Sequence, residues 1–143
     1  MTACKRILMA DDDKEVTGAP MKRILIVEDD PKVARVLHLR MRAEGHHAIT
    51  ACDAIQAIVW AKTTSPDLLL LDINLPGGSG IDVAKRLRRV LNEPIPIIFL
   101  TASKKPGLLR EAMQVGDNVS FLEKPYRAND LIAATRRLLS IER

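Results

Sequence analysis

The sequence predicts a doubly wound α/β domain, a (βα)₅ three-layer sandwich with a five-stranded parallel sheet. Short apolar runs, such as residues 24–27, 68–71 and 97–100, alternate with stretches of helical periodicity. Continuous apolar runs of this length are typical of parallel strands that are buried on both faces. The strand–helix unit repeats five times from Met21 onward, and right-handed crossovers then place helices on both faces of the sheet.

Local signals in the chain predict each element. The expected strands cover residues 22–27, 46–52, 67–72, 96–101 and 119–123. The expected helices cover about 31–44, 54–64, 80–92, 106–116 and 127–141. Asp30 and Asp53 are suited to cap the first two helices, Pro31 stands at a first helical position, and Ser79 has capping-box spacing to Asp82.

Composition restricts the classes of function. The 143 residues suffice for one domain, and 47% hydrophobic content suits a compact core. A net charge of +4 without a dense Lys/Arg tract does not indicate direct nucleic-acid binding by this chain. No apolar stretch approaches the roughly 18 residues that span a bilayer. Acidic residues 11–13 stand where a signal peptide would need its apolar segment, so we expect a cytoplasmic protein without membrane contact.

The first twenty residues contain a partial copy of the next segment of the chain. Residues 5–16 repeat residues 22–33 at an offset of 17, including the Lys-Arg-Ile-Leu start and an acidic triplet. Residues 1–20 are therefore a leader that resembles a duplicated first strand, and residues 21–143 form the domain. Two interpretations stay open. In the first, residues 1–20 are a leader without a place in the fold, and Met21 is the natural start. In the second, they form a strand that competes for the central sheet position or pairs with a sheet edge of another molecule.

Polar side chains stand at the carboxyl ends of four of the expected strands or directly after them. They are Glu28-Asp29, Asp72, Thr101 and Lys124. In a parallel sheet of this kind, functional groups gather outside the carboxyl ends of the strands, so we expect these side chains to meet. Crowded carboxylates repel one another unless a cation lies among them, and an all-oxygen ligand set favours Mg²⁺. The sequence therefore predicts a magnesium site among these carboxylates.

These motifs resemble the receiver domain of two-component response regulators, the CheY-like family with its flavodoxin-like fold. The matching positions are the acidic pair Glu28-Asp29, Asp72 within residues 71–77, Thr101-Ala102 and Lys124-Pro125. The resemblance extends over residues 21–143 and is specific, because separated positions agree in order. It implies a phosphorylatable signalling switch that catalyses only its own phosphoryl transfer and dephosphorylation, rather than an enzyme acting on an external substrate.

The resemblance also implies a role for each site residue. Asp72 would accept a phosphoryl group from a sensor histidine kinase or a histidine phosphotransfer protein. Mg²⁺ would be bound by Asp29, Asp72 and the backbone carbonyl of Asn74, with Glu28 acting through water. Thr101 and Lys124 would bind the phosphoryl oxygens.

Further expectations concern the switch itself. The small side chain of Ala102 would leave room for the phosphoryl group, and Phe121 would turn inward when Thr101 moves. The Lys124-Pro125 bond is expected to be cis. The face formed by the fourth helix, the fifth strand and the fifth helix would carry the signal to a downstream protein target, and a homodimer is possible.

Alternatives remain at the level of function. The chain could be a stand-alone module or the receiver fragment of a larger DNA-binding response regulator. An aspartate-based phosphohydrolase is disfavoured, because such enzymes place the nucleophile after the first strand with a second Asp two residues later. Here the acceptor stands after the third strand and position 74 is Asn.

Several other features have simple structural interpretations. Residues 77–80 are interpreted as a flexible turn, and His38, His46 and His47 as helix-surface or strand-edge residues. The basic residues of the third helix are interpreted as its solvent-exposed face: Lys85, Arg86, Arg88 and Arg89. The segment from Gly116 to Lys124 is one residue longer than the usual family spacing, which predicts a bulge or a longer loop.

Overall fold

A computed structural model describes residues 21–140 of the chain. Five parallel strands form one sheet in the order β2-β1-β3-β6-β7. They are β1 (Arg23–Val27), β2 (His47–Ala51), β3 (Leu68–Asp72), β6 (Ile97–Thr101) and β7 (Val119–Glu123). The central strand is β3, which pairs with β1 on one side and β6 on the other. The predicted fold class is therefore confirmed.

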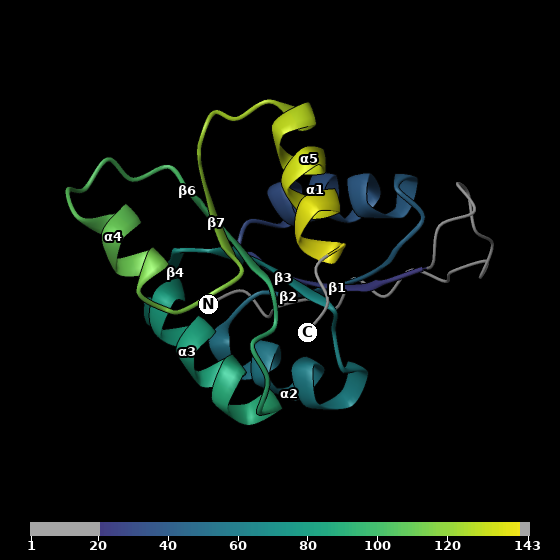
Figure 1. Cartoon of the computed structure of the whole chain (residues 1–143), viewed down its shortest axis with the longest axis horizontal. Helices are drawn as coiled ribbons and strands as arrows, with labels where there is room; N and C mark the ends of the chain where they lie inside the picture. Colours follow the sequence, from purple (N-terminus) through teal and green to yellow (C-terminus); the bar gives the residue numbers. More distant parts are fainter. Residues whose placement is uncertain (1–20, 141–143) are drawn as a thin grey trace.

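Five helices cover the sheet in two layers. They are α1 (Pro31–Ala43), α2 (Ala54–Thr64), α3 (Gly80–Leu91), α4 (Leu108–Met113) and α5 (Ala128–Leu139). In Figure 1, α1 and α5 lie on one face of the sheet, and α2 and α3 lie on the other face with α4. No helix within residues 21–140 is long and apolar enough to cross a membrane.

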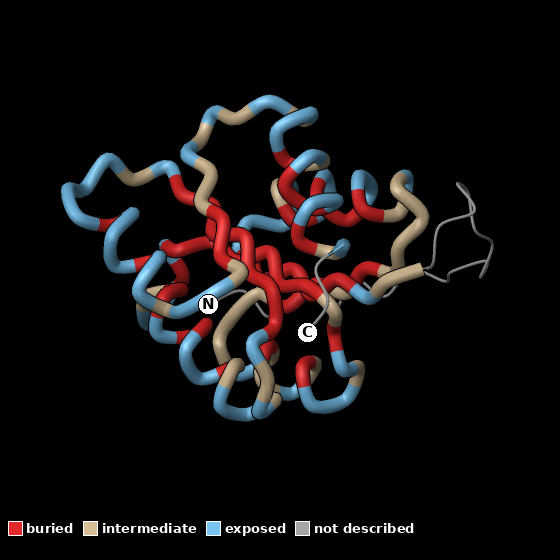
Figure 2. The backbone as a smooth tube through the Cα atoms, viewed as in Figure 1, coloured by how far each residue is buried: buried red, intermediate tan, exposed pale blue. Residues whose placement is uncertain are grey.

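The sheet separates two apolar clusters, because successive side chains of a strand point to opposite faces. Leu25 and Val27 of β1 contact the cluster beneath α2, α3 and α4, whereas Ile24 and Ile26 contact the cluster beneath α1 and α5. All four side chains are at most 1% exposed. Figure 2 shows the buried strands as a continuous layer between the helices.

Three helices start at the predicted capping residues. The side chain of Asp30 accepts a hydrogen bond from the backbone N–H of Lys32, and Asp53 accepts one from Gln56. Ser79 caps α3 by accepting from the N–H of Ile81. These bonds satisfy donors that the first turn of a helix otherwise leaves without a partner. The three caps also fix the direction in which the chain enters α1, α2 and α3.

Two elements differ from the prediction. The fourth helix spans Leu108–Met113 rather than 106–116, because the chain adopts a left-handed conformation at Gly107 and turns again after Met113. Residues 77–80 are not simply a flexible turn: β4 (Asn74–Leu75) and β5 (Gly78–Ser79) form a short antiparallel hairpin. Two-residue strands produce no periodicity that a sequence pattern could reveal.

The longer segment after α4 forms a loop and not a bulge. The pairing of β6 with β7 runs without interruption from Ile97–Val119 to Thr101–Glu123. The additional length lies instead in the turn before β7, where Gly116 and Asn118 both have positive φ values of 138° and 60°.

Arg88 holds this turn and is not part of a solvent-exposed basic face. Its guanidinium donates to the carbonyls of Ile95 at 2.9 Å and Val115 at 3.3 Å, and also to Asp117. The side chain thereby ties the end of α3 to the segments that precede β6 and β7. No local pattern indicates this role, because the partners are backbone carbonyls outside α3, and two of them lie 27 and 29 residues away in the chain.

His38 is also placed differently from the prediction. It is 0% exposed, and neither ring nitrogen has a hydrogen-bond partner among the residues described.

The predicted duplicate of the first strand, residues 1–20, lies outside the described residues.

Candidate functional site

Three carboxylates lie together at the carboxyl edge of the sheet. Glu28 and Asp29 stand directly after β1, and Asp72 ends the adjacent strand β3. One oxygen from each carboxylate lies within 4.8 Å of the other two. Parallel pairing in register places the ends of β1 and β3 side by side, which explains why residues so distant in sequence meet here.

The Lys124 ammonium lies between two of these acidic groups. Its Nζ is 3.4 Å from Glu28 Oε1 and 3.5 Å from Asp72 Oδ2. Lys124 stands after β7 at the end of the sheet, two strands away from β3, and its backbone N–H donates to the carbonyl of Thr101 at 2.7 Å. Burial disfavours its charge, but attraction to Glu28 and Asp72 prevails and raises the pKa of Lys124.

The acidic cluster carries more negative charge than Lys124 balances. Burial, together with the nearby Asp72 carboxylate, raises the pKa of Glu28 from 4.5 to about 7, although the backbone N–H of Asp30 and the Lys124 ammonium act in the opposite direction. Glu28 is only 2% exposed. An additional cation at this position would relieve the repulsion, and three oxygen ligands suit Mg²⁺. The residues present therefore fit a magnesium ion.

Thr101 is positioned by contacts to its hydroxyl oxygen. The backbone N–H of Ser103 donates to this oxygen at 3.0 Å, and the side-chain amide of Asn74 lies 3.4 Å from it. Both contacts use the oxygen as acceptor, so the hydroxyl can donate its own proton outward. Thr101 is fully buried, while the next residue, Ala102, is exposed.

The Asp72 carboxylate is held in place by the turn immediately after it. The backbone N–H of Asn74 donates to Asp72 Oδ1 at 2.8 Å. The side chain of Asn74 is exposed at the mouth of the site. This local turn leaves Asp72 Oδ2 as the oxygen that contacts Lys124.

Gly80 is a site-supporting residue that sequence patterns did not identify. A Cβ at this position would lie 2.1 Å from the carbonyl oxygen of Asp72 and 2.8 Å from the Cα of Ile73. Its backbone N–H donates to the Ile73 carbonyl at 2.7 Å. The first turn of α3 thus contacts the backbone of the aspartate directly, and only glycine permits this distance. The glycine-rich segment itself was visible in the sequence, but the close contact was not.

Two further predicted residues lie beside the site. Phe121 on β7 is half-buried and packs against the cluster beneath α2, α3 and α4. The Lys124–Pro125 peptide bond is cis. It directs the chain from β7 toward Tyr126.

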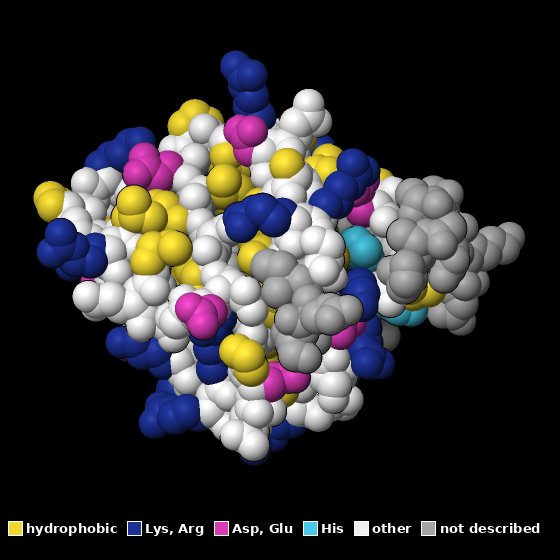
Figure 3. Space-filling model, viewed as in Figure 1, with side chains coloured by type: hydrophobic (Ala, Val, Ile, Leu, Met, Phe, Trp, Pro, Cys, Tyr) yellow, Lys and Arg dark blue, Asp and Glu magenta, His cyan; other side chains and the backbone are white. Residues whose placement is uncertain are grey.

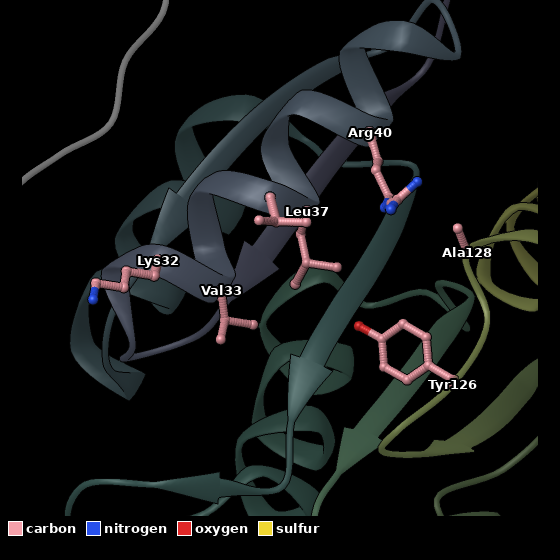
Figure 4. Close-up of a pocket in the computed structure, with 7 residues that line it drawn as sticks. Lys32, Val33, Leu37, Arg40, Tyr126 and Ala128 are labelled. Carbon is pink, nitrogen blue, oxygen red and sulfur yellow. The ribbon is translucent and has the colours of Figure 1, made fainter.

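A pocket opens between α1 and the segment that leads from Lys124 into α5. Figure 4 shows the hydroxyl of Tyr126 directed toward α1, opposite Val33 and Leu37, with Lys32 and Arg40 at the rim. The pocket therefore has an apolar floor and two cationic side chains at its edge.

Fold and site together define a class: a doubly wound α/β protein with an aspartate, an acidic pair, a hydroxyl and a lysine at the carboxyl ends of its parallel strands. Residues 24–136 match the response regulator receiver domain family. The chain belongs to this family and is a receiver domain of a two-component response regulator. Such domains are signalling switches that interact with histidine kinases, and they generally bind Mg²⁺ in an acidic pocket.

Relatives of known name support this assignment. The chain is 36% identical over 118 residues to the DNA-binding response regulator MtrA of Mycolicibacterium smegmatis, covering 82% of this chain and 50% of that protein. It is 34% identical over 119 residues to the phosphate regulon transcriptional regulatory protein PhoB of Pseudomonas aeruginosa, covering 82% and 52%. The chain thus spans about half the length of these relatives.

Solved structures show the same architecture. The chemotaxis protein CheY4 of Vibrio cholerae has a TM-score of 0.75 at 25% identity, covering 83% of this chain and 99% of that one. A two-component response regulator from Clostridium difficile has a TM-score of 0.76 at 25% identity, covering 83% and 96%.

Proposed function

We propose that Asp72 is the phosphoacceptor of this receiver domain and that a histidine kinase or a histidine phosphotransfer protein is the donor. The P–N bond of a phosphohistidine breaks as a P–O bond forms to an Asp72 oxygen, and the histidine nitrogen retains the electron pair and takes up a proton. The product is an acyl phosphate on Asp72.

The convergence of Glu28, Asp29 and Lys124 on Asp72 carries this proposal. Phosphoryl transfer needs placement of the acceptor and neutralisation of charge on the transferring oxygens, and little covalent chemistry beyond that. The ammonium of Lys124 lies 3.5 Å from the Asp72 carboxylate. It can therefore form an ion pair with an oxygen of a phosphoryl group that is bonded to Asp72. The Thr101 hydroxyl can donate to another oxygen, and the exposed, small Ala102 leaves the approach open.

Asp29, Asp72 and the backbone carbonyl of Asn74 would hold Mg²⁺, with Glu28 acting through a water molecule. The ion would neutralise charge on the phosphoryl oxygens when bound. The support for this ligand set is the spacing of the three carboxylates and the raised pKa of Glu28, which both indicate a site with excess negative charge.

Treatment with acetyl phosphate and Mg²⁺, followed by intact mass measurement, tests the proposal. The wild type should gain about 80 Da, the mass of one phosphoryl group. Asp72→Asn should gain nothing, whereas Asp82→Asn, which alters an exposed carboxylate on α3, should behave as the wild type. Equal modification of wild type and Asp72→Asn would refute the assignment of the acceptor.

The donor protein would contact the pocket between α1 and Tyr126, because this pocket adjoins the site and carries Lys32 and Arg40 at its rim. Val36 lines it and is 50% exposed. Val36→Asp should slow transfer from a phosphorylated donor protein without slowing modification by acetyl phosphate. Val59→Asp on α2, which alters a residue of similar exposure, is the matched control. If Val36→Asp slowed transfer from the donor protein and modification by acetyl phosphate equally, this contact would be contradicted.

The phosphorylated state would be transmitted through the face formed by α4, β7 and α5. Leu109 and Met113 of α4 are 55% and 46% exposed, and apolar side chains gather in this region of the surface between α4 and α5 (Figure 3). A downstream protein or a second copy of the chain could cover them. Beryllofluoride, a phosphoryl mimic, should shift amide resonances across this face. Shifts confined to the loops around Asp72 would contradict the proposal.

A second candidate function is that of the receiver part of a DNA-binding response regulator. The names of the relatives favour it, since MtrA is a DNA-binding response regulator and this chain matches only about half of its length. The sequence encoded beyond residue 143 would decide the question, because a DNA-binding domain there would establish this function.

A further inference from the structure

The pocket between α1 and Tyr126 has the size of a binding site for a small molecule. Its volume of about 360 Å³ falls in the range of protein cavities that enclose small organic ligands. One wall is formed by α1, and the opposite wall by Tyr126 and by Ala128 at the start of α5 (Figure 4). The pocket thus lies between two elements that are far apart in the chain.

The wall on α1 combines apolar and cationic side chains in a regular pattern. Lys32, Val36 and Arg40 stand four residues apart, and Val33 and Leu37 follow the same spacing beside them. Side chains at this spacing lie one above another on one face of a helix. Leu37 is 2% exposed and Val36 is 50% exposed. Leu37 therefore belongs to the floor of the pocket, and Val36 belongs to its rim.

Two hydrogen-bond donors at the pocket are not used within the described part of the chain. The hydroxyl of Tyr126 points toward α1 (Figure 4). Neither this hydroxyl nor the guanidinium of Arg40 forms a hydrogen bond or an ion pair with any residue from 21 to 140. By comparison, the Arg136 side chain donates to Glu44 at 2.9 Å. Arg40 and Tyr126 are therefore available to a ligand.

The charges around the pocket favour a ligand with a single negative charge. Burial is the main cause that raises the pKa of Tyr126, whereas the charges of Lys124 and Arg40 act in the opposite direction. The phenol therefore stays protonated near neutral pH and can donate a hydrogen bond. The carboxylates of Glu28 and Asp72 also raise this pKa, so their field reaches the phenol. They would repel a phosphate dianion more strongly than a carboxylate.

We propose that this pocket binds a small organic acid that has one carboxylate and a flat apolar body. The carboxylate lies between the guanidinium of Arg40 and the hydroxyl of Tyr126, and the apolar body packs on Val33 and Leu37. Each of the two carboxylate oxygens then accepts a hydrogen bond from one of the two donors. Binding of the acid does not depend on phosphorylation of Asp72.

A bound acid would compete with the protein that donates the phosphoryl group. Val36 stands at the rim of the same pocket, and the proposed donor contact requires this rim to be accessible. The acid would therefore slow transfer from the donor protein and leave modification by acetyl phosphate unchanged. This consequence rests on the proposed function, whereas the binding site itself does not.

Titration of the full chain with cinnamate, a flat aromatic carboxylate, tests the binding. Cinnamamide is the matched control ligand, because it has nearly the same shape and no charge. Tyr126 is the single tyrosine of the chain, so a ring-labelled tyrosine reports directly on the pocket in NMR spectra. Cinnamate should shift this resonance with a Kd in the millimolar range, as expected for a ligand of about ten non-hydrogen atoms. Cinnamamide should bind more weakly, and equal affinity for both ligands, or no shift with either, would overturn the proposal.

Substitutions identify the groups that hold the carboxylate. Arg40→Gln removes the charge and Tyr126→Phe removes the hydroxyl, and each should weaken cinnamate binding about two- to fivefold, measured from the amide shifts of α1. Neither should alter the weaker binding of cinnamamide, which shows that the pocket stays intact. Arg35→Gln is the matched control, because Arg35 is an exposed cation of the same helix that does not line the pocket. Equal losses in Arg35→Gln and Arg40→Gln would indicate general attraction to α1 and would overturn the site.

Phosphoryl transfer tests the consequence separately from the binding. Cinnamate should slow transfer from a phosphorylated donor protein to the wild type, and cinnamamide at the same concentration should slow it less. Modification by acetyl phosphate should be the same with and without cinnamate. If cinnamate shifts the Tyr126 resonance and leaves transfer from the donor protein unchanged, the donor contact at this pocket is wrong and the binding site stands.

Discussion

Gly80 lies against the backbone of Asp72 so closely that a Cβ at position 80 would be 2.1 Å from the Asp72 carbonyl oxygen. The hairpin of β4 and β5 connects these two residues and returns the chain to the strand end it has just left. The start of α3 thereby fixes the position of the Asp72 backbone, and with it the position of the Asp72 side chain.

Gly80→Ala should therefore destabilise the protein and weaken phosphorylation. Its methyl group meets backbone atoms, which cannot move aside as a flexible side chain can, and we expect a loss of about 1–3 kcal/mol in unfolding free energy. Gly78→Ala is the matched control, because nothing lies within 4 Å of a Cβ there. Urea unfolding of both variants measures the difference. Equal stability would show that the hairpin can shift without cost.

Mg²⁺ should stabilise the folded protein, and more strongly at pH 8 than at pH 6. Glu28, with a pKa raised to about 7, contributes stability that is lost as the pH rises through 7, because its ionised form is repelled in the buried cluster. A bound cation removes this repulsion, and below pH 7 it must first displace a proton. At a hundredfold excess over Kd the gain is about 2.7 kcal/mol. Thermal unfolding with and without Mg²⁺ measures it, with Asp29→Asn as the variant expected to lose the gain.

Arg88→Met should destabilise the turn before β7. The substitution leaves the carbonyls of Ile95, Val115 and Asp117 without their common donor, which we expect to cost about 1–3 kcal/mol. Arg86→Met, at an exposed position of the same helix, should change stability little. Hydrogen exchange of the β7 amides should accelerate in Arg88→Met and not in Arg86→Met. Unchanged protection in both would argue against Arg88 as the residue that holds this turn.

His38 should contribute a loss of stability as the pH falls below about 6.5, the ordinary pKa of histidine, which is opposite in sign to the contribution of Glu28. Burial, and to a smaller extent the charges of Arg42 and Arg35, lowers the pKa of His38. The unfolded chain then binds a proton that the folded protein does not, so protonation favours unfolding. His38→Phe should weaken this dependence when unfolding is measured at pH 5.5 and 7.5. If the wild type and His38→Phe lost the same unfolding free energy between pH 7.5 and pH 5.5, the effect would belong to other groups.

Much of the fold could be predicted from local sequence patterns. The apolar runs of β1, β3 and β6 are buried on both faces, and such strands carry a signal that needs no knowledge of their partners. The capping residues Asp30, Asp53 and Ser79 act within three residues of their own position, so their roles were also visible. The hairpin of β4 and β5 and the short α4 were missed or misjudged because they contain too few residues for periodicity.

The sequence by itself determined that the acidic residues, the threonine and the lysine stand at strand ends, because strand ends are marked by the local change from apolar to polar residues. Only the tertiary structure decided which of these groups touch, that Gly80 contacts the backbone of Asp72, that Arg88 binds carbonyls rather than water, and that His38 is enclosed. The physical reason is the same in each case: these contacts depend on distances between separate elements, and such distances are set by how helices and loops pack on the sheet.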